Sequence, residues 1–215
     1  MRPLIKLDSM KATMKTLSAI LICCFISTIQ MYGENIQRPE SENYVKGVEA
    51  LNEGNPEAAY TYLNAEINEH PDNGYAHCYM ALICNFCNDT KLALKALNSS
   101  LELIPEADTE YRSFAHYSRG VLLTNLKMWE HAEADLNEAI RLNPEDVENY
   151  KSRAQLYFET ERYEESLDDL TRALKLDSKA DVNDLVLQLM AVAPTSEFME
   201  RITATYQQLD QATIH

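Results

Sequence analysis

The clearest pattern of hydrophobic and polar positions lies in residues 113–146, where two short stretches with helical periodicity follow one another and Pro144 closes the second. Leu136 and Ile140 stand four residues apart, which places both on the same face of a helix. Gly120 stands in the middle of the first stretch, where a small side chain lets a neighbouring backbone approach closely. Because proline cannot continue a helix, this stretch predicts a pair of helices that ends at Pro144.

The same pattern returns along the chain in three series of positions, each with steps of 34, 39 and 34 residues. The first helix has small residues at Gly47, Ala81, Gly120 and Ala154. The second helix has small residues at Ala59, Ala93, Ala132 and Ser166. The end of the second helix is marked by Pro71, Pro105, Pro144 and Ser178. Because three independent series agree, the sequence predicts four helix–turn–helix repeats, at residues 40–73, 74–107, 113–146 and 147–180.

The step of 39 places five extra residues between the second and third repeats, around residues 106–112. We expect this insertion either to lengthen the first helix of the third repeat or to kink the stack there. The chain has only 5 Gly and 7 Pro in 215 residues, which favours helices throughout. A single repeat cannot bury its own apolar face, so the core must form by stacking of neighbouring repeats. The predicted fold is therefore all-α, an α-solenoid.

Residues 181–215 continue the helical pattern without matching the repeat, and they predict two capping helices. Asp181 is the expected cap of the first, and Thr195 is the expected cap of the second, which runs from Glu197 to about Gln211. The apolar positions of the first helix are Val182, Leu185, Val186 and Leu189. Those of the second helix are Phe198, Ile202, Tyr206 and Leu209. Two alternatives stay open, a diverged fifth repeat and a helix that docks on a partner.

Residues 1–33 predict a secretory signal. Lys11 and Lys15 precede the apolar run Leu17–Ile29, in the order of the charged and apolar regions of a signal peptide. The run is short for a membrane-spanning helix of ~20 residues, so we expect a cleaved signal, with an uncleaved N-terminal anchor as the alternative. Residues 34–39 form a polar linker. Both alternatives predict an exported protein, in the periplasm or cell envelope of a bacterium, with a membrane contact only through this N-terminal segment.

The chain is strongly acidic, with a formal net charge of −15. Nucleic-acid binding needs clusters of Lys and Arg that neutralise phosphates, so no nucleic-acid partner is expected. The same acidity disfavours an anionic membrane surface. It serves solubility, or it attracts a basic partner, and both interpretations stay open.

No arrangement of residues typical of catalysis or of metal binding is found in the sequence. None of the 5 His stands at a spacing typical of metal ligands or of a nucleophile and its base, and there is no phosphate-binding loop. Cys84 and Cys87 form a CxxC pair at the predicted C-terminal end of a helix, where the helix dipole disfavours a thiolate. We expect buried apolar cysteines in this repeat, with a disulfide, or a redox or metal role, as alternatives. The prediction is no enzymatic activity, no metal and no cofactor.

The third repeat resembles the tetratricopeptide repeat, and the residues that carry the resemblance are Gly120, Trp129, Ala132 and Pro144. The fourth repeat is similar at Ala154, Tyr157, Tyr163, Ala173 and Asp177, and it departs from the family at Ser166 and Ser178. The first two repeats are more divergent, with Asn43 and His77 where the family has an aromatic residue. The resemblance covers about 140 of the 215 residues. It implies a right-handed superhelical stack of helix pairs that binds other proteins.

In this family the first helix of each repeat lines a concave groove, and the resemblance implies the same here. The expected partner-binding residues in the groove are Tyr44, Asn52, Tyr75, Tyr79, Asn85, Phe86, Phe114, Tyr117 and Asn125. Aromatic rings with polar tips are common anchors at binding surfaces, and the asparagines can hydrogen-bond an extended peptide backbone. The alternative is that several of these side chains pack under the neighbouring repeat. The clamp of lysine, asparagine and arginine with which some family members hold carboxylate ends is absent.

The predicted function is a non-catalytic scaffold or adaptor in the bacterial cell envelope that binds a peptide or helix of another protein in this groove. One alternative is a structural protein that self-assembles, forming a homo-oligomer through the C-terminal helices. Another is an accessory subunit of an envelope enzyme complex. Nothing in the sequence identifies the partner protein.

Overall fold

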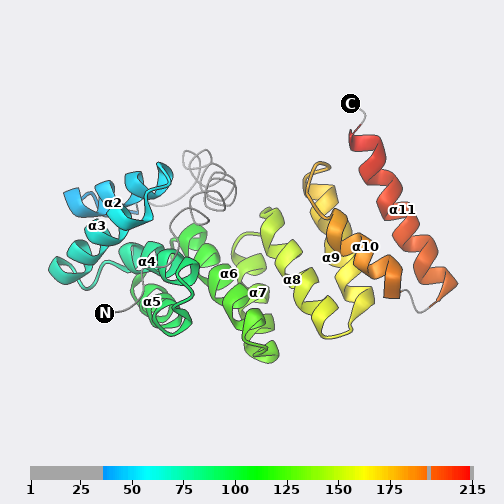
Figure 1. Ribbon diagram of the computed structural model, residues 1–215, viewed down its shortest axis with the longest axis horizontal. Helices are drawn as coiled ribbons and strands as arrows, with labels where there is room; N and C mark the ends of the chain where they lie inside the picture. Colours follow the sequence, from blue (N-terminus) through cyan, green and yellow to red (C-terminus); the bar gives the residue numbers. More distant parts are fainter. Residues whose placement is uncertain (1–35, 193–194, 214–215) are drawn as a thin grey trace. The chain divides into compact units, whose positions relative to one another are not determined.

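The computed structural model describes residues 36–192 and 195–213, and every regular element within these ranges is an α-helix (Figure 1). The helices of the first two predicted repeats are α2 (Glu42–Asn52), α3 (Pro56–Glu69), α4 (Gly74–Phe86) and α5 (Thr90–Leu103). Those of the next two are α6 (Thr109–Asn125), α7 (Trp129–Leu142), α8 (Val147–Glu159) and α9 (Tyr163–Leu176). The last two are α10 (Asn183–Val192) and α11 (Ser196–Thr213). The predicted signal or anchor, residues 1–33, lies outside the described residues.

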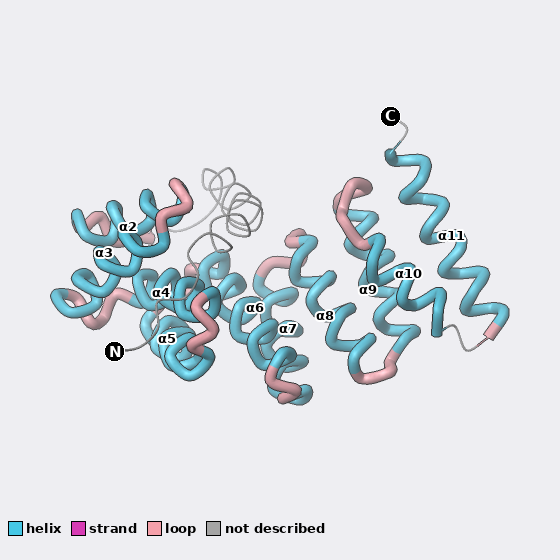
Figure 2. The backbone as a smooth tube through the Cα atoms, in the orientation of Figure 1, coloured by secondary structure: helices cyan, strands magenta, loops and turns pink. Residues whose placement is uncertain are grey.

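The described chain divides between Asp108 and Thr109 into two compact units, the first with α2–α5 and the second with α6–α11. Short loops separate consecutive helices in both units (Figure 2). In each repeat the first and second helices make the closest packing, and the second helix also packs on the first helix of the next repeat within the same unit. The predicted all-α helical-repeat fold is therefore confirmed.

Each repeat turns between its helices through one residue in the left-handed region of backbone conformation. These residues are Gly54 (φ 71°), Asn88 (58°), Lys127 (59°) and Glu161 (60°). The amide after each one donates to the carbonyl five residues back, in the pairs Asn55–Ala50 (2.8 Å), Asp89–Cys84 (2.8 Å), Met128–Leu123 (2.9 Å) and Arg162–Tyr157 (2.8 Å). These bonds satisfy helix-end carbonyls that otherwise have no partner. The same turn thus recurs in all four repeats, although only one of them has glycine.

The small residues of the first helices lie where the second helix approaches. A Cβ added to Gly47 would lie 2.7 Å from Cγ of Leu63, and one added to Gly120 would lie 2.8 Å from Cγ of Leu136. Both leucines are fully buried. The close approach predicted from the first series is therefore present in these two repeats.

The insertion between the second and third repeats lengthens a helix. The helix α6 has 17 residues, whereas α4 and α8, the first helices of neighbouring repeats, have 13 each. Its first residue, Thr109, follows directly on the boundary between the two units. The longer first helix expected from the sequence is therefore present in the third repeat.

The C-terminal helices complete the core of the second unit. Val186 and Leu189 of α10 and Phe198 and Ile202 of α11 are almost fully buried, in one cluster with the leucines of α9. The hydroxyl of Thr195 accepts a hydrogen bond from the amide of Phe198 at 3.1 Å, which confirms the predicted cap. The described apolar side of α11 is thus used within the chain, so these residues are not free to dock on a partner.

A single arginine ties α11 to α9. The guanidinium of Arg201 donates to Glu164 and, at 2.6 Å, to Oδ1 of Asp168. Because all three side chains are largely exposed, the stabilisation is modest, about 0–1 kcal/mol for each pair. The α10–α11 pair is also less closely packed than the helix pairs of the four repeats.

Candidate protein-binding faces

Three of the predicted groove tyrosines lie inside the first unit. Tyr44 of α2 and Tyr75 and Tyr79 of α4 are only 7%, 4% and 9% exposed. The rings of Tyr44 and Tyr79 pack at a centroid distance of 6.1 Å and an angle of 56°. Tyr44 and Tyr79 thus pack across neighbouring repeats, in line with the alternative stated above, and all three side chains have little accessible surface left for a partner.

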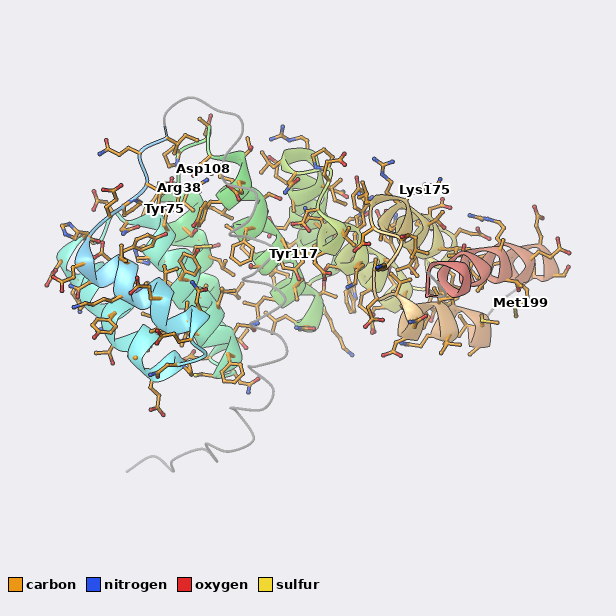
Figure 3. All side chains as sticks on the ribbon, turned by 90° about the horizontal axis from the view of Figure 1, so that it is seen from above. Arg38, Tyr75, Asp108, Tyr117, Lys175 and Met199 are labelled. Carbon is orange, nitrogen blue, oxygen red and sulfur yellow. The ribbon has the colours of Figure 1, made fainter. Side chains whose placement is uncertain are left out.

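The hydroxyl of Tyr75 is held by a buried carboxylate. It donates to Oδ2 of Asp108 at 2.9 Å, and Asp108 is only 1% exposed. Arg38 reaches the same carboxylate with two hydrogen bonds, from Nε to Oδ2 at 3.0 Å and from Nη2 to Oδ1 at 3.1 Å (Figure 3). Arg38 belongs to the predicted linker, which is thereby fastened to the end of the second repeat. Sequence reasoning missed this pair because its two residues are 70 positions apart.

The remaining predicted residues of the first unit lie at helix ends. Asn52 and Asn85 are exposed near the C-termini of α2 and α4, and Phe86 is half-buried at the last position of α4. They are not covered in the way the three tyrosines are. In the first unit, a partner would therefore contact the residues at the C-terminal ends of α2 and α4.

The cysteines of the second repeat differ in burial. Burial raises the pKa of the Cys78 thiol to about 12, and burial together with the charge of Asp89 raises that of Cys84 to about 11. Both side chains are therefore protonated at neutral pH and behave as small apolar residues, as predicted. Cys87 differs from the prediction, because it is exposed where it caps the end of α4.

In the second unit the predicted aromatic residues are only half-buried. Phe114 and Tyr117 of α6 stack with ring centroids 6.3 Å apart and an angle of 25°. The helix α8 lies beside α6. Burial and the negative charge of Glu148 on α8 raise the pKa of the Tyr117 phenol to about 12, although a hydrogen bond with Ser152 acts to lower it. Asn125 is exposed at the last position of α6. This face combines aromatic area with nearby polar groups, as binding surfaces commonly do.

A cleft of about 190 Å³ lies further along the same unit, between α8 and α10. Its lining consists of Lys151, Gln155, Leu170, Asp181, Val182, Asp184, Leu185 and Gln188. None of these was among the predicted partner-binding residues. Sequence reasoning missed the cleft because α10 does not match the repeat pattern, although Lys151 and Gln155 stand at groove positions of the fourth repeat.

Ion pairs hold together the helices of the third and fourth repeats. Arg119 donates to Asp135 at 2.7 and 2.8 Å, and Arg153 donates to Asp169 at 2.8 and 2.7 Å. Burial by itself would raise the pKa of Asp135, but hydrogen bonds from Arg119 and His116 outweigh it and hold this pKa below its ordinary value. Both pairs join residues 16 apart, a spacing that sequence reasoning did not single out.

The described residues show no group of three or more His, Cys, Asp or Glu placed to hold a metal ion. Among the described helices, none combines the length and the apolar character that crossing a membrane requires.

Known proteins share these repeats. A family model described as "Tetratricopeptide repeat" matches residues 115–146 and 148–179. Human "Tetratricopeptide repeat protein 6" is 24% identical over 143 residues, which are 66% of this chain and 26% of that protein. The "Lipoprotein NlpI homolog" of Haemophilus influenzae is 31% identical over 87 residues, 40% of this chain and 28% of that protein. The matched region thus spans about a quarter of the length of each relative.

The helical arrangement also has a counterpart among solved structures. A structure of MamA from Desulfovibrio magneticus RS-1 is similar to this chain with a TM-score of 0.64 at 19% identity. The similarity covers 79% of this chain and 94% of that one. At this level of identity the comparison concerns the fold alone, and it agrees with the succession of helix pairs seen here.

Proposed function

Because the chain is a tetratricopeptide-repeat protein, we propose that it is a non-catalytic scaffold of the bacterial cell envelope that binds a segment of another protein. The fold is that of a protein–protein interaction scaffold. The finer proposal places the binding surface on the first helices of the second unit. The observation that carries it is the stacked, half-buried pair of Phe114 and Tyr117 beside the polar residues of α8.

Physical chemistry favours this pair over the tyrosines of the first unit. A binding anchor must leave water when the partner arrives, so it must be accessible beforehand. Phe114 and Tyr117 are partly accessible residues, whereas Tyr44, Tyr75 and Tyr79 are at most 9% exposed. Substitution of Tyr79 would therefore damage the core rather than probe binding.

The location in the envelope is supported by the charged and apolar pattern of residues 1–33. It is also supported by the relative from Haemophilus influenzae, whose name describes it as a lipoprotein homolog. Fractionation of cells that make the full chain tests this part. Recovery in the envelope fraction is expected, and recovery in the cytosol would contradict it.

Site-specific crosslinking tests the binding surface. The full chain would carry a photoreactive phenylalanine analogue at position 114 in its native cell, and we expect one dominant crosslinked protein. The double substitution Phe114→Ala and Tyr117→Ala should lower recovery of that protein at least about tenfold, the equivalent of about 1.4 kcal/mol.

Tyr60→Ala is the matched control. Tyr60 is 45% exposed on α3, a second helix, and lies in the other unit. Its removal takes away a similar aromatic surface but should leave recovery unchanged. Equal recovery by the double variant, with an unchanged thermal unfolding curve, would show that the partner binds elsewhere.

A further inference from the structure

We propose that the cleft between α8 and α10 binds a basic side chain, lysine or arginine, of the protein segment that the second unit captures. This inference rests on the proposed function, because it names the chemistry of the bound segment. The cleft combines an apolar floor with a polar rim. Such a combination is typical of sites that take a side chain of mixed character.

The floor of the cleft is apolar and firmly packed. Leu170 is 1% exposed, Val182 3% and Leu185 8%, and all three belong to the core cluster of the unit. Lysine and arginine have long methylene stems that pack on such surfaces while the charged end stays near water. The cleft volume of about 190 Å³ can accept one side chain of this kind.

The rim offers two carboxylates that the described chain leaves without a partner. Asp181 precedes α10 and Asp184 lies in its first turn, and both are exposed. Neither has a hydrogen-bond or ion-pair partner among the described residues. By contrast, the two buried acids of the unit, Asp135 and Asp169, each have an arginine.

The cation already present in the cleft does not neutralise these two acids. Nζ of Lys151 donates to Oε1 of Glu148 at 2.8 Å, so its charge is balanced within α8. The amide nitrogen of Gln155 donates to Glu159 at 2.9 Å, and the amide oxygens of Gln155 and Gln188 can accept hydrogen bonds at the rim. An ammonium or guanidinium group supplies several donors and no acceptor, which matches this set.

Charge complementarity decides against the other occupants. The chain has a formal net charge of −15, and the cleft adds two unpaired carboxylates, so an acidic side chain or a chain terminus with a free carboxylate would be repelled. A purely apolar side chain would fill the floor but leave both carboxylates without partners. Only a basic side chain uses the floor and the rim together.

The first experiment uses a small probe and needs no partner protein. Nuclear magnetic resonance of the isotope-labelled full chain would be followed while N-acetylarginine amide is added, with N-acetylglutamate amide as the matched control. We expect saturable shifts of the amides of residues 151–155 and 181–188 with the arginine probe alone. Absence of these shifts, or equal shifts with both probes, overturns the proposal.

The second experiment uses substitutions and the partner recovered by crosslinking at position 114. Asp181→Asn with Asp184→Asn should weaken binding of that partner about tenfold and reduce its dependence on salt. The matched control is Glu197→Gln with Glu200→Gln, two exposed acids three residues apart at the start of α11. The control removes the same charge and should change binding less than about twofold.

The outcomes separate this proposal from the proposed function. If the Phe114 and Tyr117 substitutions abolish capture while the cleft substitutions have no effect, the binding surface stands and the cleft proposal is wrong. If both pairs of acid substitutions weaken binding equally, general acidity attracts the partner and the cleft proposal is again wrong. Asparagine keeps the size of aspartate, so thermal unfolding should be unchanged and serves as the check on folding.

Discussion

The turn at Gly54 provides a clean test of the repeat architecture. Gly54 has φ of 71°, and an added Cβ would find no atom within 4 Å. In Gly54→Ala the new methyl group therefore meets no neighbour, and any effect on stability comes from the backbone conformation. The left-handed region costs a residue with a Cβ about 1–2 kcal/mol, and the smaller conformational entropy of the unfolded alanine chain returns about 0.4–1 kcal/mol. We expect a net destabilisation of about 1 kcal/mol.

Urea unfolding of the full chain, followed by circular dichroism, measures this change. The slope of the free energy of unfolding against urea should stay constant, which shows that the substitution has not altered the cooperative unit. Glu53→Ala is the control at the neighbouring residue, which has an ordinary φ of −77°, and it should have an effect close to zero.

The reciprocal substitution is Lys127→Gly, because Lys127 holds φ of 59° at the equivalent turn. Glycine relieves the cost of the left-handed conformation but raises the conformational entropy of the unfolded chain. The difference predicts a stabilisation of about 1 kcal/mol. The reasoning is refuted if Gly54→Ala leaves the free energy of unfolding unchanged while Lys127→Gly lowers it. That result would mean that side-chain contacts, not backbone conformation, determine the stability of these turns.

Three further predictions concern polar contacts. Met128 is the N-cap residue of α7, and its side chain makes no capping hydrogen bond. Met128→Asp should raise the free energy of unfolding by about 1 kcal/mol, because a carboxylate can accept a hydrogen bond from a first-turn amide. Urea unfolding measures this change. The pKa of Asp135 is lowered in the folded chain. The ionised Asp135 therefore stabilises the folded state above the ordinary carboxyl pKa near 4. This stabilisation is lost as pH falls through the lower folded-state pKa. Asp135→Asn should therefore flatten the acid side of the melting-temperature profile, and an unchanged profile would contradict this. Arg38→Gln should destabilise the first unit by about 2 kcal/mol, because it removes two charge-assisted hydrogen bonds to the buried Asp108; equal urea midpoints would refute it.

Local chemistry explains why the helices could be predicted so well. The caps at Asn55 and Asp89 accept hydrogen bonds from amides three residues further on, at 3.1 Å each. Such contacts depend on neighbours along the chain, so the residue type alone indicates them. The cap at Thr195 was predicted on the same grounds and is present.

The candidate binding surface could be predicted only in part. The positions of Phe114 and Tyr117 on the first helix of the third repeat predicted that they line a binding groove, and both are half-buried. The same reasoning indicated Tyr44, Tyr75 and Tyr79 equally, yet these are buried. The exposure of a ring depends on what the neighbouring helix and distant loops place against it, and these contacts have no fixed spacing along the chain.

The sequence by itself determined the helices, their pairing into repeats and the close approach at Gly47 and Gly120, because these follow from a periodic pattern of small, apolar and turn residues. The tertiary structure decided three other features. It brought Arg38 to Asp108 across 70 positions, it buried tyrosines expected in a groove, and it opened a cleft where α10 departs from the repeat. Each depends on contacts between segments far apart in the chain, whose free energy is set by the packed neighbours rather than by the local pattern.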